Sequence, residues 1–162
     1  MTYLARQATS HDAVGMSLVL GEVIRMWKSD RVYDADHVLT HYITHPDRIA
    51  CTVIQDDAGD ILGFQSLKRA KPGNIYDVTP GWGIIGSYVR NGVTGQGIGR
   101  ALFAVTQREA RTANLPAIDA TIGTSNKSGL AYYQAIGFQT YLTAPGKIRK
   151  RFDLESPVAD QV

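Results

Sequence analysis

The sequence predicts an α/β fold built on one mixed sheet, with the element order β-α-α-β-β-β-α-β-α-β-β. Short apolar runs with strand character alternate with segments of helical periodicity. At the centre of the chain a strand, a glycine-rich loop, a helix and a further strand follow one another, which is typical of a parallel pair within a mixed sheet. Two strand pairs with short connections add antiparallel neighbours.

The composition indicates one domain of ordinary size. The chain has 162 residues, of which 44% are hydrophobic, enough for a proper core. No repeat, linker or low-complexity segment divides it. We therefore expect a single domain over residues 1–155, followed by a polar tail over residues 156–162.

Charge and cysteine content exclude several classes of protein. Seventeen basic and fifteen acidic residues give a net charge of +2, too small to indicate nucleic-acid binding. The single cysteine, Cys51, excludes an internal disulfide and suits a reducing compartment. The first ten residues lack the apolar core of a signal peptide, and no apolar run approaches the length of a membrane span. We expect a cytoplasmic protein with neither a membrane nor a nucleic-acid partner.

The N-terminal third predicts a strand and two helices. A short strand over Tyr3–Arg6 precedes a capping box made by Thr9 and Asp12. A first helix is then predicted by four apolar residues at helical spacing: Met16, Val19, Val23 and Trp27. A second helix from about Asp34 to Thr44 carries an apolar stripe, consisting of Ala35, Val38, Leu39, Tyr42 and Ile43.

The remaining elements follow in a regular order. "IACTVIQD" and "ILGFQSLK" predict two strands joined by a hairpin turn, and "WGIIGSYV" predicts a strand ending at Val89. After the glycine loop come a helix, the strand "AIDATI" and a helix ending near Gly137. "FQTYL" and "IRKRFDL" close the sheet as an antiparallel pair. Because Lys147, Arg149 and Arg151 alternate on the last strand, we expect that strand to be a solvated or subunit-contact edge.

The stretch "GVTGQGIGRAL", residues 92–102, places four glycines directly before a helix. Glycine lets successive amides turn the same way and leaves no Cβ in the path of a ligand, while the helix start adds unpaired N–H groups and positive potential. The loop therefore predicts an anion cradle, with a flexible connection as the alternative. The P-loop pattern fails at the helix start, and the dinucleotide fingerprint fails because its third glycine falls on Arg100.

The glycine loop resembles the acetyl-CoA loop of the GNAT N-acetyltransferase superfamily. Val89 stands at the strand end, Gly97-Ile98-Gly99 at the Gly-x-Gly, and Arg100 where a basic residue often faces the phosphates. Thr94 departs from the family pattern, which has Arg or Gln there. Downstream, "NKSGLAYYQAIGF", residues 126–138, is similar to the family's Asn…Tyr-x-x-x-Gly-Phe segment. The specific resemblance covers about Trp82–Tyr141.

The resemblance implies an acetyl-CoA co-substrate and no metal. It implies that the strand ending at Val89 splays from the strand Ala117–Ile122, with the pantetheine arm in the gap. Amides near Tyr88 and Val89 would hold the thioester oxygen. The acceptor amine attacks directly, so Cys51 is expected to pack rather than to act as a nucleophile. The residues implied to bind acetyl-CoA are Tyr88, Val89, Thr94, Gly95, Gln96, Gly97, Ile98, Gly99, Arg100 and Asn126.

Tyr133 is the candidate catalytic residue. It matches the family's tyrosine, whose phenol can give a proton to the departing CoA thiolate. The alternative is a core aromatic, a role that suits its neighbour Tyr132 better because Tyr132 lies one turn before Ile136.

The general base is less clear from the sequence. The strand before the glycine loop has no carboxylate, which leaves Glu22, Asp119 and the histidines. We interpret Asp119 as a buried structural carboxylate rather than a base that works through water. The repeat of His37, His41 and His45 could clasp a metal, but a surface role is favoured, with His41 near the acceptor entrance.

The sequence thus predicts an acetyl-CoA-dependent N-acetyltransferase that acts on a small primary amine or an amino-acid-like acceptor. An aromatic pocket for the amine could come from Trp27, Tyr33, Tyr42, Tyr76 and Trp82, each of which could also be plain core. Two alternatives stay open: a non-catalytic acyl-CoA-binding or regulatory module, and an acetyltransferase of protein N-termini or lysines. A homodimer is possible, because small GNAT proteins are often dimers.

Overall fold

The computed structural model describes residues 2–93 and 95–154. Thr94 and the tail predicted over residues 156–162 lie outside the described residues. The first half holds β1 Leu4–Gln7, α1 Ala13–Met26, α2 Ala35–Val38, β2 Arg48–Gln55, β3 Ile61–Arg69 and β4 Gly83–Val89. The second half holds α3 Ile98–Thr112, β5 Ala117–Gly123, α4 Lys127–Ala135, β6 Gln139–Ala144 and β7 Lys147–Asp153. This order confirms the predicted element order and the mixed α/β class.

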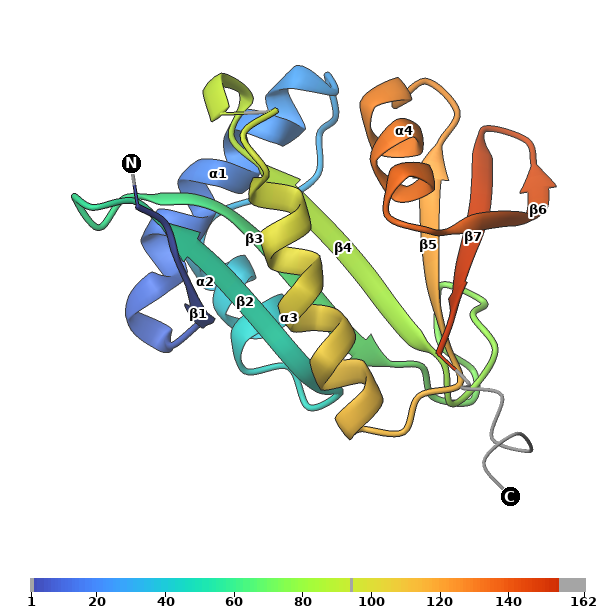
Figure 1. Ribbon diagram of the computed structural model, residues 1–162. Coiled ribbons are helices and arrows are strands. Elements are labelled where there is room, and N and C mark those ends of the chain that lie inside the picture. Colours follow the sequence, from blue (N-terminus) through green and yellow to red (C-terminus); the bar gives the residue numbers. More distant parts are fainter. Residues whose placement is uncertain (1, 94, 155–162) are drawn as a thin grey trace.

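One sheet contains the strands of the described region, in the order β1-β2-β3-β4-β5-β7-β6. Its single parallel pair is β4 with β5, and this pair is joined only at its beginning, where Gly83 is opposite Ile118 and Ile84 is opposite Asp119. Beyond Ile84 the two strands separate, so the sheet opens into a V between β4 and β5 (Figure 1). The predicted splay of these two strands is therefore present.

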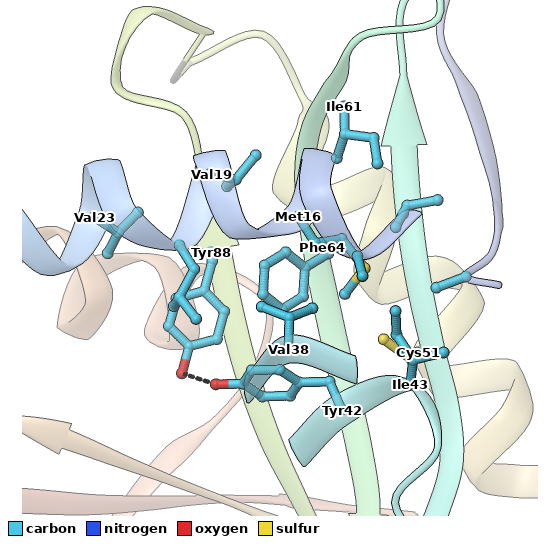
Figure 2. Packing of buried hydrophobic residues seen from close by; sticks show 14 of the residues in the cluster. Met16, Val19, Val23, Val38, Tyr42, Ile43, Cys51, Ile61, Phe64 and Tyr88 are labelled. Atoms are coloured by element: carbon cyan, nitrogen blue, oxygen red, sulfur yellow. Dashed lines mark hydrogen bonds between the residues drawn. The ribbon is translucent and has the colours of Figure 1, made fainter. Parts of the chain in front are cut away.

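The helices cover both faces of the sheet. α1 and α2 pack on one face through a core that includes Met16, Phe64 and Tyr88 (Figure 2). α3 and α4 pack on the other face, where Phe103 and Phe138 contact one another at a centroid distance of 5.6 Å. Both helices begin just after the separating ends of β4 and β5, so their N-termini lie beside the open end of the V (Figure 1).

The helical N-terminal segment differs in detail from its prediction. The main-chain N–H of Thr9 donates to the Asp12 carboxylate at 2.8 Å, as a capping box requires, but the first turn is a 3-10 turn over Ser10–Asp12. The second helix starts after Asp34 as expected and changes into a π-turn over Leu39–Ile43. Among the described residues, none of the helices is long and apolar enough to cross a bilayer.

The position of the last strand was predicted incorrectly. β7 lies between β5 and β6, so the free edge belongs to β6 and β7 is an interior strand, although Lys147 at its start is exposed. Arg149 is only 5% exposed; its guanidinium donates to the main-chain oxygens of Tyr76 and Asp77, the latter at 2.9 Å. Arg151 lies over the Trp82 ring, 4.7 Å from its centroid. These cations are therefore held by the fold instead of forming a solvated edge.

Candidate active site

Two cavities meet where β4 and β5 separate. The first, which we call the α2-side cavity, has a volume of about 490 Å³. Its lining residues come from α2, the segments beside it and the sheet face below: Arg31, Val32, His37, His41, Tyr42, Ser66, Lys68, Tyr76, Ile84, Ile85, Gly86, Tyr88, Asp119 and Thr121.

The second cavity, which we call the α4-side cavity, has a volume of about 550 Å³. It is lined by the end of α1, by β4 and β5, and by α4: Met26, Trp27, Lys28, Arg31, Ile85, Gly86, Ser87, Tyr88, Thr121, Ile122, Gly123, Ser125, Asn126, Gly129, Tyr132 and Tyr133. Both linings include Arg31, Ile85, Gly86, Tyr88 and Thr121. The two cavities therefore share a wall at the opening between β4 and β5.

A chain of hydrogen bonds crosses the α4-side cavity wall. The Tyr133 hydroxyl and Ser87 Oγ are 2.7 Å apart, and the Gln65 amide donates to Ser87 Oγ at 2.8 Å and to the Tyr132 hydroxyl at 2.9 Å. Tyr132 in turn donates its proton to the main-chain oxygen of Gly99 at 2.7 Å. Because Tyr132 has used its only proton, it can only accept from Gln65, and this fixes the orientation of the Gln65 amide.

The two adjacent tyrosines have different surroundings. Burial raises the pKa of Tyr133 far above its ordinary value, although the bond to Ser87 opposes the shift. Burial also raises the pKa of Tyr132, to about 12. Tyr132 is held by Gly99 and Gln65, whereas Tyr133 shares its hydroxyl with a single serine at the cavity. Both phenols are therefore protonated at neutral pH. The Tyr132 proton is donated to a main-chain oxygen, whereas the Tyr133 hydroxyl has only the Ser87 hydroxyl as a partner.

The glycine loop has the bare backbone that an anion cradle needs. Gly95 and Gly97 have φ of +83° and +80°, in the left-handed region that favours glycine. A Cβ added at either position would meet nothing within 4 Å, so both face open space. Gly97 is the N-cap of α3, which places it beside the unpaired N–H groups of that helix. Thr94, predicted to join them, lies outside the described residues.

The other predicted loop residues have separate positions. Ile98 is buried in a small apolar cluster, so only its main chain is available to a ligand. Gly99 packs under Tyr132, because an added Cβ would come within 2.5 Å of that ring. The Gln96 side chain accepts a hydrogen bond from Tyr3, and Arg100 is exposed beside the cradle.

Asn126 and the end of β4 complete the predicted binding set. Asn126 lines the α4-side cavity and also caps α4, since its Oδ1 accepts from the Gly129 N–H at 3.0 Å. In the β3–β4 ladder, Arg90 N–H donates to the Leu62 oxygen at 2.9 Å. Alternate residues turn the same way, so Tyr88 directs its N–H to β3 and Val89 directs its N–H toward the gap. Tyr88 is among the residues that line both cavities.

The predicted aromatic residues divide between the cavities. Trp27, a candidate for both the helical apolar face and the aromatic pocket, is 37% exposed at the end of α1 and lines the α4-side cavity. Tyr42 and Tyr76 line the α2-side cavity, and the Tyr42 hydroxyl donates to that of Tyr88 at 3.2 Å (Figure 2). Tyr33 and Trp82 line neither cavity within the described part of the chain.

The candidate bases also occupy different places. Asp119 lines the α2-side cavity and accepts hydrogen bonds from Thr121 at 2.8 Å and from Tyr141 at 2.5 Å. Glu22 is at neither cavity, because its carboxylate accepts from the Asn91 N–H at 2.6 Å. His41 lines the α2-side cavity, where burial first and then the nearby cation of Lys68 lower its pKa to about 4. Asp119, His37 and His41 are therefore the candidate bases that line the α2-side cavity.

The histidine repeat forms a stack on the α2 side. The rings of His37 and His41 are 4.7 Å apart and nearly parallel, and His45 follows at 6.2 Å from His41. Within residues 2–93 and 95–154, no three histidine, cysteine or carboxylate side chains gather closely enough to hold a metal ion. Cys51 is buried in the core, and burial raises the pKa of its thiol to about 11, so it is poorly suited to nucleophilic attack.

Comparison with known protein families shows which family this chain belongs to. The model of the "Acetyltransferase (GNAT) family" matches residues 20–138, well over half of the chain. The chain belongs to the GNAT acetyltransferase family. Its separated β4–β5 pair and glycine loop both lie within the matched segment. This membership confirms the predicted enzyme class, an N-acetyltransferase. No curated protein sequence matches the chain.

Solved GNAT structures share the fold at low identity. The yncA protein of Salmonella typhimurium, solved with its cofactor acetyl-CoA, is 20% identical over 96% of this chain and 95% of its own, with a TM-score of 0.76. The paia N-acetyltransferase of Thermoplasma acidophilum, solved with coenzyme A, is 15% identical over 94% and 99%, with a TM-score of 0.77. The GNAT domain of S. lividans PAT is 17% identical over 95% and 92%, with a TM-score of 0.79.

Sequence reasoning missed three residues at this GNAT site. Gln65 and Ser87 are polar residues within apolar strands, a signal that could have indicated an internal hydrogen bond. Lys68 belongs to the same run as Gln65, and strand alternation places it on the face of Phe64 and Ser66, toward α2. Reading the strand "ILGFQSLKR" residue by residue would have flagged its buried polar positions.

Proposed function

We propose that this GNAT protein transfers the acetyl group of acetyl-CoA to the primary amine of a small molecule. The observation that carries the proposal is the joint position of Tyr133 and the glycine cradle at the open end of the β4–β5 gap. One feature supplies an acid and the other supplies an anion site, and both are needed for transfer from a phosphate-bearing thioester.

The residues present fit acetyl-CoA as a substrate. The pyrophosphate suits the open positions at Gly95 and Gly97 and the N-terminal amides of α3, with Arg100 alongside. The pantetheine arm suits the α4-side cavity, where the β5-facing edge of β4 has no strand partner beyond Ile84. Acetyl-CoA supplies an activated acetyl group in the form of a thioester.

Groups at the gap supply a proton to the leaving thiolate and stabilise the charge that develops on the thioester oxygen, while the attacking amine loses its own proton to water. Tyr133 is protonated and gives its proton to the leaving thiolate. Ser87 accepts a hydrogen bond from Gln65, so its own proton is free to turn toward Tyr133 as negative charge forms on the phenol oxygen. The Val89 N–H, directed into the gap, stabilises the negative charge that develops on the thioester oxygen.

The acceptor amine would approach from the α2-side cavity. This cavity reaches the gap through Gly86 and Tyr88, and it is partly closed by α2 and by the loop that carries Tyr76. A small molecule fits a cavity of about 490 Å³ better than an extended peptide, which would need an open groove. We therefore favour a small amine over a protein N-terminus or a lysine side chain.

The rival function is a non-catalytic acyl-CoA-binding module. Such a module needs the cradle but not a positioned acid, whereas Tyr133 has a defined partner in Ser87. The proposal also includes a cytoplasmic location and a possible homodimer. The balanced charge and lone Cys51 support the location, and sedimentation analysis of the purified protein would decide the oligomeric state.

The direct test is release of free CoA thiol from acetyl-CoA across a panel of small primary amines, with mass spectrometry of the acetylated products. We expect amine-dependent thiol release at a rate far above hydrolysis. Acetyl-CoA binding without thiol release for any amine or peptide would favour the binding module, and turnover restricted to peptides would favour the protein acetyltransferase.

A further inference from the structure

Lys68 is a buried cation in the α2-side cavity that no part of the proposed chemistry uses. It is 6% exposed, on the sheet face that looks toward α2. No hydrogen bond or ion pair joins its ammonium group to another described residue, and its closest aromatic contact is the Tyr42 ring, 5.2 Å from Nζ. A buried charge without a partner is costly, so such a residue is expected to meet a ligand of opposite charge.

The cavity around Lys68 is positive. Arg31 lines the same cavity, and the His37 and His41 pKa values are lowered by burial and by the charges of Lys68 and Arg31. Burial lowers the pKa of Lys68 to about 8, which leaves most of it charged at neutral pH. Ser66, two residues before Lys68 on the same strand face, adds a hydroxyl donor to the lining.

The one carboxylate of this lining, that of Asp119, lies on the side of the cavity opposite Lys68. Ile84 is opposite Lys68 on β3 and opposite Asp119 on β5, so the three residues form one row across the sheet. Two strand spacings separate Lys68 from Asp119, roughly 10 Å between main chains. Asp119 stands where β4 and β5 begin to separate, and Lys68 stands on the far side of the row. Asp119 therefore lies beside the gap and Lys68 lies away from it, while Arg31 belongs to the wall that the two cavities share.

We infer that the acceptor is an amine that also carries a carboxylate, which Lys68 binds, with the Arg31 charge adding to the attraction, while its amino group is directed to the Asp119 side and the gap. This inference rests on the proposed function and specifies its substrate class. The two ends of an amino acid match the two sides of the cavity in sign and order. A neutral or polycationic amine would leave Lys68 unpaired.

The test compares binding of amino acids with binding of their amides, which differ in the carboxylate. Calorimetry on protein saturated with CoA measures affinity without turnover, using leucine with leucinamide and methionine with methioninamide. The variants are Lys68→Gln, Arg31→Gln and Lys68→Arg, and the control is Lys147→Gln, an exposed lysine on β7. An amino acid and its amide also differ in the pKa of the amino group. This difference is the same for every variant, so it cancels when the acid-to-amide affinity ratio of a variant is compared with that of the wild type.

In the wild type and in Lys147→Gln, we expect at least one acid to bind about tenfold or more tightly than its amide. Lys68→Gln should reduce this preference to about twofold or less, Arg31→Gln should reduce it in part, and Lys68→Arg should retain most of it. Equal binding of acid and amide in the wild type, no binding of either, or an unchanged preference in a folded Lys68→Gln would overturn the inference. If the proposed function failed instead, the amino acid would still bind more tightly than its amide, but it would release no CoA thiol from acetyl-CoA.

Discussion

The Tyr133 hydroxyl lies 2.7 Å from Ser87 Oγ, and Ser87 lies directly opposite Gln65 in the β3–β4 ladder. The same Gln65 amide holds Ser87 and Tyr132, whose hydroxyl reaches the first turn of α3 at Gly99. Ser87 and Gln65 thus orient the candidate acid Tyr133 from the sheet. The same hydrogen bonds continue through Tyr132 to α3, the helix whose N-terminus forms the anion cradle.

Ser87→Ala should lower kcat while leaving acetyl-CoA affinity nearly unchanged. Removing a hydrogen bond that strengthens as charge forms on the Tyr133 oxygen costs about 1–2 kcal/mol, or about 5- to 30-fold in rate. Steady-state kinetics and calorimetry check the two parts. Ser17→Ala, on the exposed side of α1, serves as the matched control. An unaltered kcat in Ser87→Ala would show that Ser87 does not orient the acid.

Tyr133→Phe keeps the ring and its packing but removes the acid. Turnover should fall roughly ten- to a thousand-fold, the usual scale for a positioned general acid, while acetyl-CoA still binds. Tyr132→Phe is the paired comparison. It leaves the Gly99 oxygen and the Gln65 amide short of a partner, so it should cost about 1–3 kcal/mol of stability with most activity retained.

Thermal unfolding and initial rates of both tyrosine variants separate these effects. If Tyr132→Phe lost turnover and Tyr133→Phe kept it, the roles of the two tyrosines would be reversed.

The activity should rise with pH when a simple amine without a carboxylate is the acceptor. Only the free amine attacks, and its fraction grows about tenfold per pH unit below an amine pKa near 10. Tyr133 must be protonated to act, and its pKa lies above the ordinary phenol value, so it should not limit the rise below about pH 10. A simple amine also avoids any effect of the titration of Lys68 on carboxylate binding.

Initial rates from pH 6 to pH 9.5 at a fixed, subsaturating amine concentration, corrected for hydrolysis, check this profile as kcat/KM. Glu22→Gln and Asp119→Asn should each retain substantial kcat/KM and the same slope. A plateau above about pH 7 that one of these substitutions or His41→Ala abolished would instead reveal a dedicated base.

The glycine loop and its neighbouring helix could be predicted because their signals are local. Closely spaced glycines and a helix start specify a cradle by short-range geometry, and the strand order around it follows from alternating periodicities. The Tyr133 position could be predicted from the motif, but its partner could not. Ser87 and Gln65 meet only because β3 and β4 pair in the register that places them opposite each other.

The place of β7 could not be predicted from its own residues. An edge strand and an interior strand can both alternate basic and apolar side chains, and the choice depends on which strand of the final hairpin pairs with β5. Arg149 is buried because the main-chain oxygens of the β3–β4 loop accept from it. The role of Lys68 could not be predicted either. Strand alternation predicts the sheet face on which Lys68 lies, but it does not predict the cavity that forms between that face and α2.

The most direct test of the central claim is calorimetric binding of acetyl-CoA to Gly97→Val and Gly59→Val. Both glycines have positive φ, of +80° and +87°, and open space around an added Cβ, but Gly59 lies in the β2–β3 hairpin turn. The two substitutions therefore impose similar backbone strain, and only Gly97→Val should fill the anion cradle. We expect Gly59→Val to bind acetyl-CoA like the wild type and a folded Gly97→Val to bind it about a hundredfold more weakly or not at all. Acetyl-CoA affinity of Gly97→Val within twofold of the wild type would contradict the account.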